Sequence, residues 1–230
     1  MDGNELRWPG YLGRNYIEGR GILCVGAAYR ESTLEVERRN PVIARTNADL
    51  IACAREWISA GRSEESDERY LDRLRNAHED ALPEWDRWRR HFRTLVEDYL
   101  GMSRSEIAWA NLAKCLVSID RGSKQRAAEG VLTRLCQREF PMSELVQAIR
   151  PAVVLVAVLH ARPGGDIVRT WDAPGWSPLV FTWQGQSGHD RHNTKPGARR
   201  LSEWAPEMAA RVRARQETIS VPSVRPRNMT

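Results

Sequence analysis

The stretch GILCVGAAYRES, from Gly21 to Ser32, carries the strongest signal for the fold. Its apolar run, Ile22 to Val25, shows no alternation with polar residues, which is typical of a strand buried on both faces of a parallel sheet. Gly26 and the two alanines after it allow the backbone to turn sharply and to approach a ligand closely. Open α/β sheets bind ligands beyond the carboxyl ends of their strands. The stretch therefore predicts a central strand whose exit is either a binding site or simply a tight turn.

Three further apolar runs have the same character, and segments with helical periodicity lie between them. The runs cover residues 107–119, 152–159 and 179–183. The expected helices cover residues 47–60, 62–78, 83–100, 124–140, 143–149 and 203–216. Thr46 or Asn47 is expected to cap the first helix, and Gly61 to end it. Strands that alternate with helices predict an α/β fold, here a three-layer α/β/α sandwich with a short, mainly parallel four-stranded sheet.

A single domain is expected over residues 1–220, since 230 residues suit one large core and no internal repeat is evident. Residues 1–20 are rich in glycine and aromatic residues, and should form an ordered loop beside the first strand. Residues 221–230 should be a disordered basic tail. The aromatic stripe of the 83–100 helix is expected to be core, because its helical periodicity explains it without a base-stacking role.

The composition favours a globular protein with an anionic partner. The chain has 35 basic and 30 acidic residues, a net charge of +5 that favours nucleic acid as a partner. No apolar run is long enough to span a membrane, and the acidic N-terminus does not resemble a signal peptide. A cytoplasmic location is therefore expected, with no membrane partner and no obligatory protein partner. The four cysteines, Cys24, Cys53, Cys115 and Cys136, are widely spaced and predict buried thiols rather than disulfides or a zinc site.

Three motifs follow one another in an order that carries a family resemblance. They are WANLAKC (Trp109 to Cys115), the helix, proline and strand pattern of residues 135–159, and GQSG (Gly185 to Gly188). With the glycine-containing first strand, this order resembles the uracil-DNA glycosylase superfamily. That family has a glycine motif of the GQDPY or GEAPG type, then a TN-x-V-K-C motif, and finally a histidine loop of the HPSG type. The resemblance covers roughly residues 20–215.

The resemblance implies a DNA glycosylase that flips a base out of the DNA stack and hydrolyses its N-glycosidic bond. Asn111 matches the family's base-reading asparagine, although an asparagine here can also simply pin a strand-end turn. Gly26, Ala27, Ala28 and Tyr29 would then form the base pocket. Some branches of the family hold an iron–sulfur cluster. Cys115 and Cys136 match only two of its four ligands, so no cofactor or metal is expected.

Two motifs depart from the family pattern. Ala27 and Ala28 stand where the family has its acid, so the nearest carboxylate is Glu31, which either reaches the site or sits at a helix N-terminus. Gly185 stands where the family has its histidine. A polar cluster a few residues later offers His189 and Asp190 as catalytic groups, and Ser187, Arg191 and His192 as DNA contacts.

These features lead to three hypotheses of different classes. The first is a DNA glycosylase that removes a modified base, in anti-phage defence or base-excision repair. The small residues at positions 27, 28 and 185 would enlarge its pocket. The second is a catalytically inactive nucleic-acid-binding module on the same fold. The third is a hydrolase of free nucleosides or nucleotides, which would ignore DNA.

Overall fold

The computed structural model of the 230-residue chain describes residues 10–30, 40–61, 63–76, 94–117, 142–157, 177–183 and 201–218. Its strands are β1 (Tyr11–Leu12), β2 (Ile22–Arg30), β3 (Ile107–Val117), β4 (Val153–Ala157) and β5 (Leu179–Trp183). Its longer helices are α2 (Pro41–Ser59), α3 (Glu64–Asn76), α6 (Met142–Ile149) and α8 (Leu201–Thr218). Two short helical segments, the π-helix η2 (Thr94–Tyr99) and the 3₁₀-helix η3 (Arg104–Glu106), precede β3.

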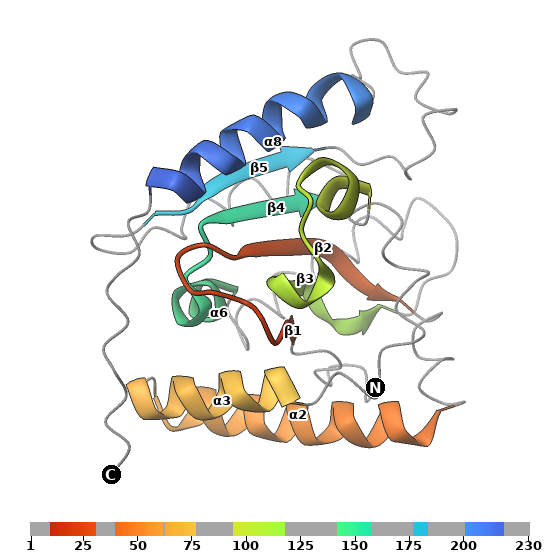
Figure 1. Cartoon of the computed structure of the whole chain (residues 1–230). Coiled ribbons are helices and arrows are strands. Elements are labelled where there is room, and N and C mark those ends of the chain that lie inside the picture. Colours follow the sequence, from red (N-terminus) through yellow and green to blue (C-terminus); the bar gives the residue numbers. More distant parts are fainter. Residues whose placement is uncertain are drawn as a thin grey trace.

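The sheet has five strands in the order β1-β3-β2-β4-β5, so the predicted number of four is wrong (Figure 1). The four predicted strands are all present, and they pair in parallel, as expected. The fifth strand, β1, comes from the segment that was predicted to be a loop beside β2. It pairs instead with β3, antiparallel, with Tyr11 opposite Trp109 and Leu12 opposite Ala108.

Side chains that alternate along the strands form two separate cores, which confirms the three-layer arrangement. One face packs against α2, α3 and α6 through Leu23, Val25, Ala108, Ala110, Val154 and Val156. The other face packs against α8 and η2 through Ile22, Cys24, Ile107, Trp109, Val153 and Leu155. Figure 1 shows α8 on one side of the sheet and the α2–α3 pair on the other. In the described part of the chain, no helix is both long and apolar enough to cross a membrane.

The first helix, α2, begins earlier than predicted. Asn40 caps it, because its Oδ1 accepts a hydrogen bond of 3.1 Å from the Val42 amide, and Pro41 occupies the first helical position. The predicted cap at Thr46 or Asn47 is therefore wrong. Asn47 is instead a buried residue within the helix. Gly61 follows the helix with a φ of +71°, a left-handed conformation that suits glycine.

The other described helices lie close to their predicted ranges, and α3, α6 and α8 each match one expected segment. Of the expected helix at 83–100, the described part is η2. Leu95 and Val96 are buried there, which confirms this part of the stripe as core. Trp85, Trp88 and Phe92, the expected helix at 124–140 and the tail at 221–230 lie outside the described residues.

The central strand β2 is longer than predicted. It continues in extended conformation through Gly26 to Arg30 and stays paired with β3 to its end, so the predicted sharp turn at Gly26 is wrong. The pairing shifts once, between Ala28 and Tyr29. There the partner residue on β3 jumps from Ala113 to Leu116. Such bulges bend a strand and increase its twist, and they occur often next to active sites.

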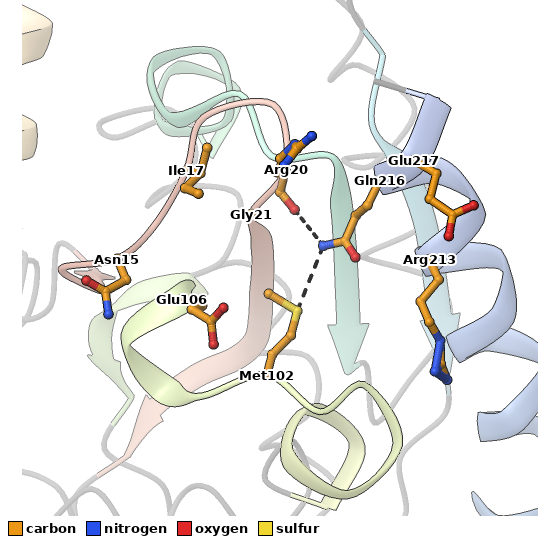
Figure 2. Close-up of a pocket in the computed structure, with 9 residues that line it drawn as sticks. All are labelled: Asn15, Ile17, Arg20, Gly21, Met102, Glu106, Arg213, Gln216 and Glu217. Carbon is orange, nitrogen blue, oxygen red and sulfur yellow. Dashed lines mark hydrogen bonds between the residues drawn. The ribbon is translucent and has the colours of Figure 1, made fainter. Parts of the chain in front are cut away.

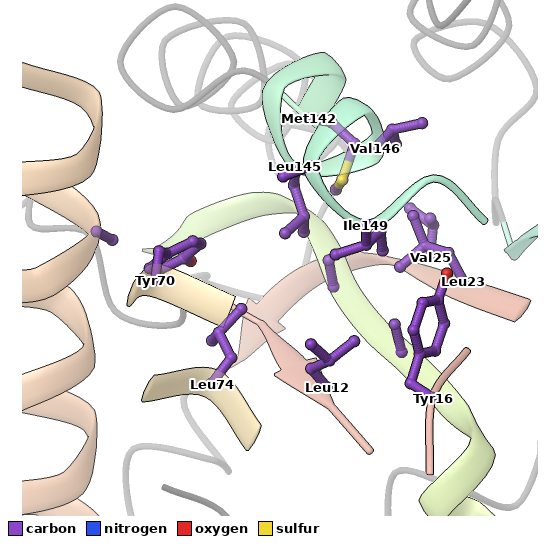
Figure 3. Close-up of a cluster of buried hydrophobic side chains, with 14 of the residues drawn as sticks. Leu12, Tyr16, Leu23, Val25, Tyr70, Leu74, Met142, Leu145, Val146 and Ile149 are labelled. Atoms are coloured by element: carbon purple, nitrogen blue, oxygen red, sulfur yellow. The ribbon is translucent and has the colours of Figure 1, made fainter. Parts of the chain in front are cut away.

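Tyr16 buries its hydroxyl in the core on the α2 side. The residue is 6% exposed, and among the described residues the hydroxyl has no hydrogen-bond partner. Figure 3 shows it pointing in among apolar side chains such as Leu23 and Val25. Burial raises the pKa of Tyr16 well above its usual value, with a further rise from Glu18. The Tyr16 ring therefore fills an apolar site in which its hydroxyl makes no hydrogen bond to the described residues.

We expect Tyr16→Phe to stabilise the fold by up to about 1 kcal/mol at pH 7, because it removes an unpaired buried hydroxyl. Since the raised pKa keeps Tyr16 neutral in the folded state while the unfolded chain ionises near pH 10, the native protein loses stability as the pH rises above about 10. The advantage of the variant should therefore grow at alkaline pH. Urea unfolding at pH 7 and pH 10.5 measures both effects, and a variant less stable than the native protein would show a bonded hydroxyl.

Candidate functional site

The carboxyl ends of β2, β3, β4 and β5 all lie at one edge of the sheet, because these four strands run parallel. Their lengths differ, however. β4 ends at Ala157 and β5 at Trp183, whose backbones pair with each other. The last register partner of β4 on β2 is Val25, so β2 and β3 extend past the other two strands as a two-stranded ribbon. The edge therefore has a step at the level of Gly26.

Gly26 and Asn111 meet at this step. They are register partners on the adjacent strands β2 and β3, and Gly26 is buried. Along β2, Ile22 and Cys24 belong to the core on the α8 side, and Ile107 and Trp109 do so along β3. Because strand positions alternate between the two faces, positions 26 and 111 continue these two series. Two residues 85 positions apart in the sequence are thus adjacent in the sheet.

The strand order gives this step a special place in the topology. The chain goes from β2 to β3 on one side, and then crosses to β4 on the other side of β2. In open α/β sheets, the crevice at such a reversal, between the carboxyl ends of the two strands concerned, is the usual ligand site. Here that crevice lies between β2 and β4, beside Val25 and Gly26. The topology therefore indicates the β4 side of Gly26, whereas Asn111 lies on β3, on the other side of β2.

The structure describes the remaining predicted site residues only in part. Ala27, Ala28 and Tyr29 belong to the β2 ribbon, with their backbones paired to β3, while their side chains and that of Asn111 lie outside what the structure describes. The other predicted residues, Glu31, Ser187, His189, Asp190, Arg191 and His192, lie outside the described residues. Arg30, the last residue of β2, is four positions past Gly26, which is roughly 13 Å of extended chain.

Two cysteine side chains are described by the structure, and neither offers a reactive thiol at this edge. Cys24 is 0% exposed on β2, free of any disulfide, and burial raises the pKa of its thiol, so it stays protonated and unreactive. This confirms Cys24 as a buried thiol. Cys53 is half-buried on α2, and burial also raises its pKa. Within the described ranges, no cluster of three or more His, Cys, Asp or Glu side chains is arranged to hold a metal ion.

A cavity that the sequence analysis missed lies at the opposite, amino edge of the sheet. It is open to solvent, with a volume of about 350 Å³, and lies between the turn before β2, the segment before β3 and the last turns of α8 (Figure 2). Its lining residues are Asn15, Ile17, Arg20, Gly21, Met102, Glu106, Arg213, Gln216 and Glu217. Because three segments far apart in the sequence form it, no local motif marked it in advance.

Comparisons of the chain with models of known families, with curated proteins and with solved structures give no match. Function must therefore be inferred from the residues and their positions in this chain.

Proposed function

We propose that this protein is a DNA glycosylase, a divergent relative of the uracil-DNA glycosylase superfamily that acts on a flipped base. The observation that carries the proposal is the pairing of Gly26 with Asn111 at the step in the carboxyl edge. The sequence motifs and the strand order both support a site at the carboxyl end of β2. β5 also ends at this edge, at Trp183, which precedes His189 by six positions in the sequence.

The proposed pocket uses backbone and amide chemistry. Gly26 has no side chain, so in our proposal the face of the base packs against its backbone at the sheet edge. The Asn111 amide carries both a donor and an acceptor, which can pair with the Watson–Crick edge of the base. The pocket would thus bind the hydrogen-bonding groups of the base, while the sugar and phosphates stay at the surface.

The reaction is a hydrolysis at C1′ of the deoxyribose. The C1′–N bond breaks, the base leaves with the electron pair, and a water oxygen bonds to C1′. A general base accepts the water's proton, and a proton neutralises the departing nucleobase. The transition state resembles an oxocarbenium ion, which a carboxylate stabilises and which lets a weakly activated water attack. In our proposal Glu31 or Asp190 supplies that carboxylate, and His189 donates to the leaving base.

The target is proposed to be a modified base. Ala27 and Ala28 replace larger groups of the family's first motif, and Gly185 replaces its histidine, so the pocket gains volume while it loses its usual acid. Anti-phage defence and base-excision repair are settings in which such a base would be met. Arg191, Ser187 and His192 are proposed to contact the DNA phosphates near the flipped nucleotide. We place this activity in the cytoplasm.

The runner-up is a catalytically inactive DNA-binding module, which the loss of an acid at positions 27 and 28 favours. An abasic-site assay on DNAs that carry uracil or enlarged bases separates the two. A glycosylase leaves alkali-labile abasic sites at one base type. A binding module leaves none, and its DNA affinity falls steeply with salt. Cleavage that survives Asn111→Ala combined with Glu31→Gln and His189→Ala would contradict the assigned site.

A further inference from the structure

The outermost strand of the sheet on the side away from β1 is β5, and it pairs with β4 along one of its two edges (Figure 1). The Leu179 amide donates to the Ala152 carbonyl at 2.9 Å, so its backbone polar groups point towards β4. Because these groups alternate in direction along a strand, those of Phe181 also point towards β4, while those of Val180 and Thr182 point outwards. Within the part of the chain that the structure describes, no strand pairs with this outer edge.

The two edges of the sheet differ in how they are protected against pairing with another chain. Natural sheets protect their edges with very short strands, charged side chains, prolines or bulges. The far edge follows this rule, because its outermost strand β1 has only two residues. In contrast, β5 has the sequence LVFTW, without a charge or a proline, and its pairing with β4 has no bulge. Pro178 limits this edge at its amino end, and Leu179, Val180 and Phe181 are only partly buried.

Helix α8 lies beside β5 and runs in the opposite direction. The Arg211 guanidinium lies 4.9 Å from the centre of the Phe181 ring. About one helical turn later, the Arg215 guanidinium donates to the Ser177 carbonyl at 2.6 Å. Moving forward along the helix therefore corresponds to moving backward along the strand. Any copy of the chain that pairs with β5 would bring its own α8 to the same region.

The charge along α8 favours a second copy of this chain as the partner. Its exposed charges are acidic in the first half, at Glu203 and Glu207, and mainly basic in the second half, at Arg211 and Arg213 before Glu217. In a dimer with two-fold symmetry, antiparallel β5 strands also set the two α8 helices antiparallel. The acidic half of each helix then lies beside the mainly basic half of the other. A peptide of one charge sign would match only one of the two halves.

We propose that two copies of this chain pair antiparallel through β5, about a two-fold axis at Phe181, and so form one continuous sheet. Val180 of each copy lies opposite Thr182 of the other, and each such pair exchanges two hydrogen bonds through the outward amides and carbonyls. The two Phe181 residues lie opposite each other at the axis, and aromatic pairs in such positions stabilise antiparallel strands. This interface does not depend on the proposed glycosylase activity.

Sedimentation equilibrium of the full chain, from about 1 to about 500 µM, tests the proposal. We expect the mean mass to rise from that of one chain to that of two, with half of the chains paired at about 10 to 100 µM. The affinity is moderate because one strand edge is smaller than a standard interface. A single-chain mass at every concentration, or a mass that continues to rise beyond two chains, would overturn the proposal.

Thr182→Pro removes one outward amide and leaves the bonds between β5 and β4 in place, so it should weaken dimer formation at least about tenfold. Thr182→Ala is the matched control, because it keeps the amide and should pair about as well as the native chain. Thermal unfolding shows whether each variant is folded. Equal dimer affinity of two folded variants would contradict the pairing of β5 strands.

Phe181→Cys tests the register without a proline. Residues that face each other at a position without hydrogen bonds have Cα atoms about 4.5 Å apart, which is within the range of a disulfide. Mild oxidation should therefore link this variant into a covalent dimer. Ser177→Cys, at an exposed position four residues from the axis, should link no more than the native chain, which accounts for the native cysteines. No linkage of Phe181→Cys, or equal linkage of both variants, would contradict the proposed axis.

Discussion

Replacing Asn111 with alanine should slow base release from DNA by about 100- to 1,000-fold, the loss typical when one preorganised hydrogen-bonding group is removed from a catalytic pocket. The reason is the place of Asn111 in the sheet. It pairs with Gly26 where β4 and β5 end, so its amide would be the group nearest the base edge. Without it, a flipped base would enter a pocket that cannot read it. Single-turnover base release on the preferred DNA measures the effect.

Asn76→Ala is the matched control, because it makes the same chemical change at the exposed end of α3. It should leave base release unchanged. DNA affinity should change little in Asn111→Ala, since phosphate contacts supply most of it. An Asn111→Ala variant that is folded and fully active would remove Asn111 from the site and leave the carboxyl-edge pocket without its base reader.

Replacing Gly13 with alanine should lower the free energy of unfolding by about 3 kcal/mol or more, among the larger effects of single substitutions. A Cβ at this position would lie 2.1 Å from the Ser105 oxygen, 2.4 Å from the Ser105 carbonyl carbon and 2.9 Å from the Ile107 oxygen. All three are backbone atoms, so no side chain can move aside. The segment after β1 would have to leave β3 and lose the Gly13 to Ile107 and Asn15 to Ser105 bonds.

Gly61→Ala provides the comparison for that experiment. Gly61 has a φ of +71° and nothing within 4 Å of an added Cβ, so alanine there costs only its left-handed backbone strain, about 1 to 2 kcal/mol. Urea unfolding of both variants gives the difference. If Gly13→Ala were no more destabilising than Gly61→Ala, the close contact between the N-terminal segment and β3 would be wrong.

Much of the fold was predictable because its strands are buried on both faces. The apolar runs at Ile22 and Val153 have no polar alternation, and Leu179–Trp183 was predicted with its observed bounds. Strands that are buried on both faces consist almost entirely of apolar residues, so the α/β class and the parallel pairing could be expected from the sequence. The same reasoning makes the carboxyl edge the candidate site, which stays a prediction.

Two of the misses, the length of β2 and the strand β1, come from long-range effects. Small residues after Val25 indicated a turn, but the backbone of β3 continues alongside, and pairing with it keeps β2 extended to Arg30. Strand conformation depends on such neighbours more than on local propensity. β1 has only two residues and therefore no periodicity to detect. The start of α2 did have a local signal, since asparagine followed by proline is a good cap and first helical residue, although the same pair can also mark a chain break.

The candidate site was predictable only as far as its strands. The pairing of Gly26 with Asn111 depends on the register between two strands 85 positions apart, which no local pattern encodes. The amino-edge cavity is a stronger case, since Asn15, Met102 and Gln216 come from three segments that are far apart in the sequence.

The most direct test of the central claim is the product of the reaction. The protein should be incubated with several DNAs, each of which contains either uracil or one kind of enlarged base. Two products are then quantified in the same sample. Mass spectrometry detects the free base, and alkaline cleavage detects the abasic site. If the protein is a DNA glycosylase, at least one of these DNAs should yield free base and abasic sites in equal amounts, with the deoxyribose left in the strand. Intact DNA throughout, or strand breaks without a free base, would contradict the proposed function.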